Sequence, residues 1–217
     1  MNLQTLTKKV VVGAENRFMF DILDTAETNI LNQDLKLDDV YNKLCQKSVS
    51  AFHIFKQFIS VDVDLEKIED MYFDYQKKYH PDNFSEDHEK LKATQICKKI
   101  NDLYECLQKP VGRLEMMLEC AGFSKDKMSI HTVQSSSMLA LMFDLKNELE
   151  ETNSQDEVHN LIQKIMLLIE EGAKKFQTLY DQKMFEQSAD QLMEQYHELC
   201  FLYKTLVSAK QKNKKFQ

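Results

Sequence analysis

The chain has 217 residues, of which 43% are hydrophobic and 29% are charged, and both values are ordinary for a globular protein. Its 28 Lys and Arg against 35 Asp and Glu give a formal net charge of −7, which argues against nucleic-acid binding by the chain as a whole. Five widely spaced cysteines include no C-x-x-C pair, so neither a zinc ribbon nor a disulfide framework is indicated. With only four Gly and two Pro, the composition favours an all-α fold.

The N-terminal region, residues 1 to 50, is treated as an extension. The first 14 residues carry Lys8 and Lys9 and no acid, a pattern that fits either a short organelle-targeting segment or a frayed terminus. Residues 15 to 50 show a sparse helical pattern through Phe18, Ile22 and Ala26. The longest unbroken apolar run in the chain, from Met138 to Phe143, is far too short to span a bilayer.

Apolar residues recur at helical spacing on both sides of a short polar loop in the first half of the chain. A short helix is predicted within AFHIFKQF, a second from Asp64 to Lys78, and a third that ends near Pro110. Acids begin the second helix and lysines end it, as the helix dipole prefers. The apolar positions are Leu65, Ile68, Tyr72, Tyr75 and Tyr79 in the second helix, and Ile96, Ile100, Leu103 and Leu107 in the third.

The loop between these helices contains His80, Pro81 and Asp82. A residue before proline is pushed away from helical backbone angles, so Pro81 ends the second helix. Two similar helices joined by one loop pack antiparallel, which turns His80 and Asp82 outward at the end of the hairpin beside Lys77 and Lys78. A capped turn with an exposed histidine is the alternative without a binding role.

The stretch YHPDNF, between helices with these apolar faces, resembles the loop of the J-domain family. J-domains dock on an Hsp70-type (DnaK- or HscA-like) ATPase chaperone and trigger its ATP hydrolysis. The resemblance therefore implies that Lys77, Lys78, His80, Pro81 and Asp82 bind such a chaperone.

Two later stretches resemble the HscB family of iron–sulfur-cluster co-chaperones: INDLYECLQKPVGRLEMMLECAGF, at its interdomain junction, and MLALMFDLKNELEE, in its C-terminal domain. The resemblance covers about residues 51 to 207. It implies an L-shaped all-α protein with a J-domain at residues 51 to 122 and a C-terminal three-helix, scaffold-binding domain at residues 130 to 217.

The helix predicted from Met138 onward has two apolar faces. One is a core stripe of Met138, Leu141, Met142, Leu145 and Leu149. The second contains Leu139, Ala140 and Phe143 and continues through Asp144, Asn147 and Glu151. A small apolar patch edged by acids suits protein docking, unless another helix covers it.

The HscB resemblance assigns this second face to an IscU-type iron–sulfur scaffold protein. The residues so assigned are Leu139, Ala140, Phe143, Asp144, Asn147, Glu151 and Phe201. Ala140 and Asn147 depart from the larger apolar and acidic residues of the family. Phe201 is expected to complete the patch from the last helix.

Two further helices complete the chain, one at about residues 156 to 180 and one that contains Leu192, Tyr196, Leu199, Tyr203 and Leu206. Their apolar stripes are interpreted as packing, and the basic tail KQKNKKF as a solvated helix end. The histidines show no metal-ligand spacing, and residues 1 to 50 hold only Cys45, so the cysteine-rich zinc module of some HscB relatives is not expected.

The resulting expectation is a co-chaperone that holds the scaffold and brings it to the ATPase chaperone, with no catalytic site, cofactor or metal of its own and no nucleic-acid or membrane partner. A general J-protein for unfolded clients and a plain helical adaptor are the alternatives, and an enzyme would need a ligand pocket that the pattern does not indicate. The expected location is the mitochondrial matrix for a eukaryotic protein and otherwise the bacterial cytoplasm.

Overall fold

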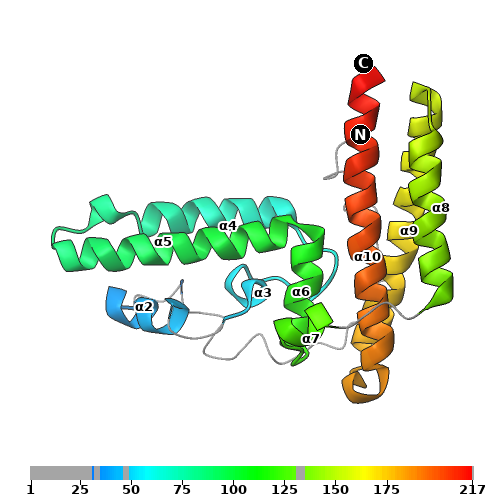
Figure 1. Ribbon diagram of the computed structural model, residues 1–217. Coiled ribbons are helices and arrows are strands. Elements are labelled where there is room, and N and C mark those ends of the chain that lie inside the picture. Colours follow the sequence, from blue (N-terminus) through cyan, green and yellow to red (C-terminus); the bar gives the residue numbers. More distant parts are fainter. Residues whose placement is uncertain (1–30, 32–34, 46–48, 131–134, 217) are drawn as a thin grey trace. The chain divides into compact units, whose positions relative to one another are not determined.

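The computed structural model describes residues 31, 35–45, 49–130 and 135–216, and all regular structure among them is helical (Figure 1). The expected all-α fold is therefore confirmed. The chain divides into two compact units, Met1–Cys120 and Ala121–Gln217. The expected L shape concerns the mutual placement of these units and stays a prediction, as do the domain boundaries and roles given above. The targeting segment and the early helix through Phe18 lie outside the described residues.

The helices of the first unit follow one another with short connections. They are α2 (Leu37–Cys45), α3 (Ala51–Ile54), α4 (Leu65–Lys78), the 3-10 helix η3 (Pro81–Asn83), α5 (Asp87–Gln108) and α6 (Pro110–Cys120).

Helix α4 begins and ends where the sequence predicts. The Asp64 side chain accepts a hydrogen bond from the Lys67 amide at 3.1 Å, so it caps one of the amides that the helix itself cannot satisfy. The last turn carries Lys77 and Lys78 near the negative end of the helix dipole. The backbone leaves helical geometry at Tyr79, directly before the loop.

Helices α4 and α5 form the antiparallel hairpin (Figure 1). Tyr72 of α4 stacks on Tyr104 of α5 with ring centroids 4.1 Å apart. The Tyr72 hydroxyl and the Gln76 amide both donate to Oδ1 of Asn101, at 2.9 and 2.7 Å. The predicted core positions of α5, Ile96, Ile100, Leu103 and Leu107, are all buried. These contacts hold both ends of the loop between the helices.

Helix α5 ends at Gln108, near Pro110 as the sequence predicts, and a helix that the sequence analysis did not assign begins directly after it. Pro110 begins α6, where its missing N–H costs no helical hydrogen bond. The buried Arg113 of α6 donates from Nε to the Val61 carbonyl at 2.8 Å and from Nη1 to the Leu107 carbonyl at 2.6 Å. This side chain therefore joins the end of α5 to the segment that precedes α4.

Helix α2 was missed by the sequence analysis. It lies against α5 and fully buries Val40 and Leu44, and Asp38 pairs with Lys92 of α5 at 2.6 Å. The signal was present, because acids occupy its first turn and Val40 and Leu44 are four residues apart. A helix of nine residues is marginal alone, so α2 depends on burial against α5.

The second unit contains the remaining helices. They are α7 (Lys125–Ile130), α8 (Ser136–Glu151), α9 (Gln155–Asp181), α10 (Phe185–Asn213) and the 3-10 helix η4 (Lys214–Phe216). Ser135 caps α8 and Ser154 caps α9, each through its side-chain oxygen.

The core of the second unit lies between α8, α9 and α10. Its buried members are Leu145, Val158, Leu161, Ile162, Ile165, Leu202, Leu206 and Ala209. Two lysines also join α8 to its neighbours. Lys164 of α9 forms an ion pair with Glu148 at 2.6 Å, and Lys212 of α10 donates a hydrogen bond to the Leu149 carbonyl at 2.6 Å. A lysine at the last carbonyls of α8 is favourable for the helix dipole. The basic tail thus contributes Lys212 to packing, in contrast to the expectation of a merely solvated end.

Replacing Leu44 with Ala is expected to destabilise the first unit by roughly 2–5 kcal/mol, because the side chain is fully buried and its removal leaves a cavity. Urea unfolding followed by circular dichroism measures this loss. Asn42→Ala, on the exposed side of the same helix, should change stability by no more than about 0.5 kcal/mol. Equal stability of the two variants would show that α2 does not belong to this core.

Candidate functional site

The His80–Pro81–Asp82 loop connects α4 to α5 as a 3-10 turn with His80 as its N-cap. His80 has extended backbone angles, φ −61° and ψ 134°, as expected before proline. Its side chain is 57% exposed and that of Asp82 is 89% exposed. The predicted outward placement of both groups at the hairpin end is therefore observed.

The imidazole of His80 makes two local contacts through Nδ1. It accepts a hydrogen bond from the Asp82 amide at 3.3 Å and lies 3.6 Å from Oδ2 of the Asp82 carboxylate. An acceptor Nδ1 places the proton of the neutral ring on Nε2. Both side chains remain open to solvent.

Asn83 fixes the loop to the end of α4. Its side-chain amide donates to the Lys77 carbonyl at 2.7 Å and to the Lys78 carbonyl at 3.3 Å, two acceptors that the helix leaves without intrahelical donors. Sequence analysis assigned no role to Asn83. The signal lies in its residue type, since Asn side chains commonly bond to nearby backbone groups in turns.

The last turn of α4 places Lys77 and Lys78, both exposed, beside the loop. Earlier turns of the same helix expose Glu66, Glu69, Asp70 and Asp74.

Lys78 has an intramolecular contact that the sequence did not indicate. Its Nζ donates to the Leu31 carbonyl at 2.9 Å and lies 5.4 Å from the ring centroid of Tyr79. The Tyr79 hydroxyl donates to the same carbonyl at 3.3 Å, and burial raises the pKa of this phenol to about 12. Lys77 and Lys78, adjacent in sequence, therefore have different surroundings.

The second face of α8 is exposed in the described part of the chain. Leu139 is 52% exposed and Phe143 is 65% exposed, and Ala140, Asp144 and Glu151 are exposed beside them. The described helices of the second unit therefore leave these five side chains uncovered. Asn147, the sixth predicted residue of this face, is half-buried.

Phe201 of α10 is partly buried and packs against the core cluster of α8, α9 and α10. It directly precedes the buried Leu202 on the same helix. Its expected part in completing the patch stays a prediction.

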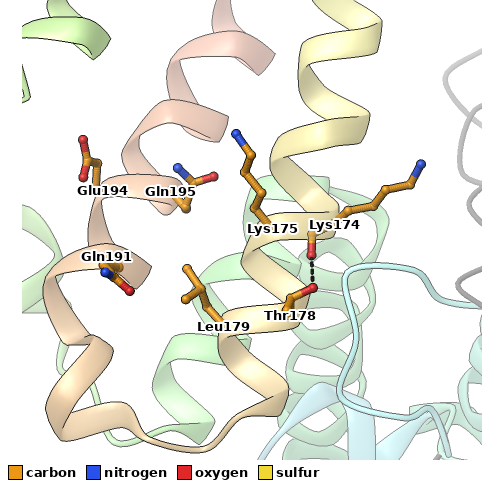
Figure 2. Close-up of a pocket in the computed structure, with 7 residues that line it drawn as sticks. All are labelled: Lys174, Lys175, Thr178, Leu179, Gln191, Glu194 and Gln195. Carbon is orange, nitrogen blue, oxygen red and sulfur yellow. Dashed lines mark hydrogen bonds between the residues drawn. The ribbon is translucent and has the colours of Figure 1, made fainter. Parts of the chain in front are cut away.

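A shallow groove of about 450 Å³ lies between α9 and α10 (Figure 2). It is lined by Lys174, Lys175, Thr178, Leu179, Gln191, Glu194 and Gln195, none of which the sequence analysis singled out. Within it, the Thr178 hydroxyl donates to the Lys174 carbonyl at 2.8 Å, and Lys174 pairs with Glu170 at 2.8 Å. These are contacts within a helix, and they assemble no acid–base or nucleophilic pair.

Metal-ligating residues do not gather in the part of the chain that the structure covers: no group of three or more His, Cys, Asp or Glu there could hold an ion. No helix among the described residues is long and apolar enough to cross a membrane. Of the features that the sequence analysis singled out, the loop at the hairpin end and the second face of α8 are exposed among the described residues.

Comparison with known sequences gives no match to a family model. The chain is 29% identical over 116 residues to a co-chaperone HscB homolog from Shewanella amazonensis, a match that covers 52% of this chain and 66% of that protein. It is 25% identical over 152 residues to an HscB homolog from Photobacterium profundum, covering 65% and 86% of the two chains. Both relatives are bacterial and give no support to a mitochondrial location.

Among solved structures, the chaperone HscB from Vibrio cholerae shares the fold with a TM-score of 0.64 at 23% identity, over 78% of this chain and all of that one. The structural likeness establishes the all-α fold that the chain shares with this chaperone. The chain is, more narrowly, similar in sequence and in fold to HscB-type co-chaperones, which confirms the resemblance read from the sequence. This likeness supports a co-chaperone role.

Replacing Asn83 with Ala is expected to loosen the loop, because two backbone acceptors lose their donor at a cost of about 1 kcal/mol. Hydrogen exchange of the Asn83 and Phe84 amides, which bond to the His80 and Pro81 carbonyls, should become roughly five-fold faster. Ser85→Ala, at an exposed neighbouring position, serves as the control. Unchanged exchange rates in the Asn83 variant would contradict the role of Asn83 in fixing the loop to the end of α4.

Proposed function

We propose that the chain is a co-chaperone that binds an IscU-type iron–sulfur scaffold protein through α8 and docks on an Hsp70-type, HscA-like ATPase chaperone through the loop after α4. The observation that carries the proposal is the exposed His80–Pro81–Asp82 loop at the end of a rigid hairpin, in a chain similar to HscB co-chaperones. The two surfaces belong to different units, and each is treated separately below.

At the hairpin end, His80 and Asp82 offer one imidazole and one carboxylate within a turn that Pro81 stiffens. Because the turn is already ordered, docking costs little conformational entropy. Lys77 and Lys78 add positive charge suited to an acidic partner surface, which raises the rate of encounter. This set fits recognition of a folded partner, and the loop binds one conformation of the ATPase better than another.

On α8, the scaffold-binding surface consists of Leu139, Ala140 and Phe143, with Asp144, Asn147 and Glu151 along its edge. Apolar side chains this exposed contribute to binding when a partner removes them from water. The acids favour a partner with basic residues around an apolar contact. Phe201 acts indirectly, since it packs against the core on which α8 rests.

In this mechanism the chain raises the local concentration of the scaffold at the chaperone. Contact with the His80–Pro81–Asp82 loop favours the hydrolysis-competent state of the ATPase, and hydrolysis then traps the scaffold for cluster transfer. The chemistry takes place on the partner, so the proposal requires no catalytic group in this chain.

Single-turnover ATP hydrolysis by the HscA-like chaperone tests the docking loop. We expect stimulation by the wild-type chain, a further increase when scaffold is added, and a loss of at least about ten-fold with His80→Gln, since removal of a central contact costs about 1.4 kcal/mol or more. Stimulation without a scaffold effect would favour a general J-protein for unfolded clients. If neither form stimulates hydrolysis, a plain helical adaptor is the remaining interpretation.

Scaffold binding by α8 is tested with Phe143→Ala, for which we expect roughly thirty-fold weaker binding, as for loss of an exposed aromatic anchor worth about 2 kcal/mol. Titration calorimetry against the isolated scaffold measures it. Leu167→Ala is the matched control, because Leu167 is 61% exposed but lies on α9. Equal binding by both variants would remove α8 from the proposed interface.

A further inference from the structure

The groove between α9 and α10 lies on the side of this helix pair against which α8 packs. Lys164 of α9 and Lys212 of α10 both bond to α8. Lys175 follows Lys164 by 11 residues, which is about three helical turns. Glu194 precedes Lys212 by 18 residues, which is about five turns. Lys175 and Glu194 of the groove therefore project from the same sides of α9 and α10 that contact α8.

Helix α8 is too short to cover this whole side. It has 16 residues, whereas α9 has 27, so the two helices are about 24 Å and 40 Å long at 1.5 Å per residue. Because a short connection joins them, they run antiparallel, and the start of α8 lies toward the later part of α9. Figure 1 shows that α9 and α10 continue beyond the start of α8. The groove, formed by late residues of α9, lies in this continuation.

Several polar groups of the groove have no partner within the described part of the chain. Gln195 donates from Nε2 to Glu198 at 3.1 Å, but its Oε1 is buried and accepts a hydrogen bond from none of the described residues. Lys175 and Glu194 form no ion pair with any described residue either. Figure 2 shows Lys175 and Leu179 of α9 facing Gln195 of α10 across the groove. A buried acceptor without a donor costs free energy, which a bound donor would recover.

These groups define the chemistry of an occupant. It must bring an N–H or O–H donor to Oε1 of Gln195, an acid to Lys175 and an apolar group to Leu179. The groove is shallow, with a volume of about 450 Å³, so an occupant lies across it and is not enclosed by it. A segment of a folded protein meets all of these requirements, because a polypeptide carries backbone donors and side chains of each kind.

The position of the groove indicates which protein this is. Leu139, on the exposed second face of α8, lies in the first turn of that helix, at the end toward the groove. A partner that covers Leu139 and extends past the start of α8 therefore reaches the groove.

We propose that the α9–α10 groove is a second contact for the iron–sulfur scaffold protein, in which a scaffold segment donates a hydrogen bond to Oε1 of Gln195 and places an acidic side chain at Lys175. The inference rests on the proposed binding of the scaffold by α8. The two contacts lie in the same unit and act together, so loss of either one weakens a single binding event.

Gln195→Met separates binding from a structural role. Methionine has a similar length but no acceptor, so the variant removes the buried unpaired oxygen. The melting temperature of the free chain should stay the same or rise, whereas scaffold binding should become roughly five-fold weaker. A side chain that served packing alone would shift both quantities in the unfavourable direction.

The charge contact is tested with Lys175→Glu in the full chain. Titration calorimetry against the isolated scaffold should give roughly ten-fold weaker binding at low salt, and the difference should shrink as salt is added. Lys204→Glu is the matched control, because Lys204 is exposed and follows Gln195 by nine residues, about two and a half turns, on the opposite side of α10. It should bind the scaffold within about two-fold of wild type.

Each outcome decides the inference. If Phe143→Ala weakens scaffold binding but Gln195→Met and Lys175→Glu bind as wild type, the groove is overturned and the contact through α8 stands. If Gln195→Met melts below wild type while Lys175→Glu binds normally, Gln195 is structural and the inference is overturned. Absence of scaffold binding by the wild-type chain overturns the proposed function and the groove with it.

Discussion

The stacking of Tyr72 on Tyr104, with ring centroids 4.1 Å apart, joins α4 to α5 near the middle of the hairpin, and the position of the loop follows from it. Asn101 extends the junction by accepting from Tyr72 and Gln76. Two helices held in register leave the connecting chain little freedom. His80 and Asp82 can then stand exposed without disorder, because the stability of the loop comes from the buried faces behind it.

In the second unit, too, an exposed surface is supported by a buried one, because α8 has two apolar faces. Leu145 enters the core, whereas Leu139 and Phe143 remain in water. An exposed apolar face favours aggregation when the helix that carries it is poorly held in the fold. Here Lys164 of α9 and Lys212 of α10 bond to α8, and Phe201 packs against the core that the three helices share. Helix α8 therefore exposes apolar side chains on one face while its other face remains packed in the bundle.

The extension adds a second layer to the hairpin of the first unit. Helix α2 is too short to persist alone, and its two buried residues become stabilising only against α5. Leu31 lies at the end of α4, where its carbonyl accepts a hydrogen bond from Lys78, which stays exposed.

The sequence by itself determined the local features of this protein. Helical periodicity identified α4, α5, α8, α9 and α10. Acids marked the start of α4 and Pro81 its end, because the helix dipole, proline geometry and apolar spacing act within a few residues. Its resemblance to HscB-type proteins came from the same stretches.

Only the tertiary structure decided which surfaces those helices leave open. Helix α2 depends on burial against α5, Phe201 turns toward a core that three helices build, and Lys78 bonds to a carbonyl 47 residues away. Neither periodicity nor composition reports such contacts, since they depend on where distant segments meet in space. The predicted face of α8 was visible in sequence, but its exposure was settled by the packing of α9 and α10 on the opposite side.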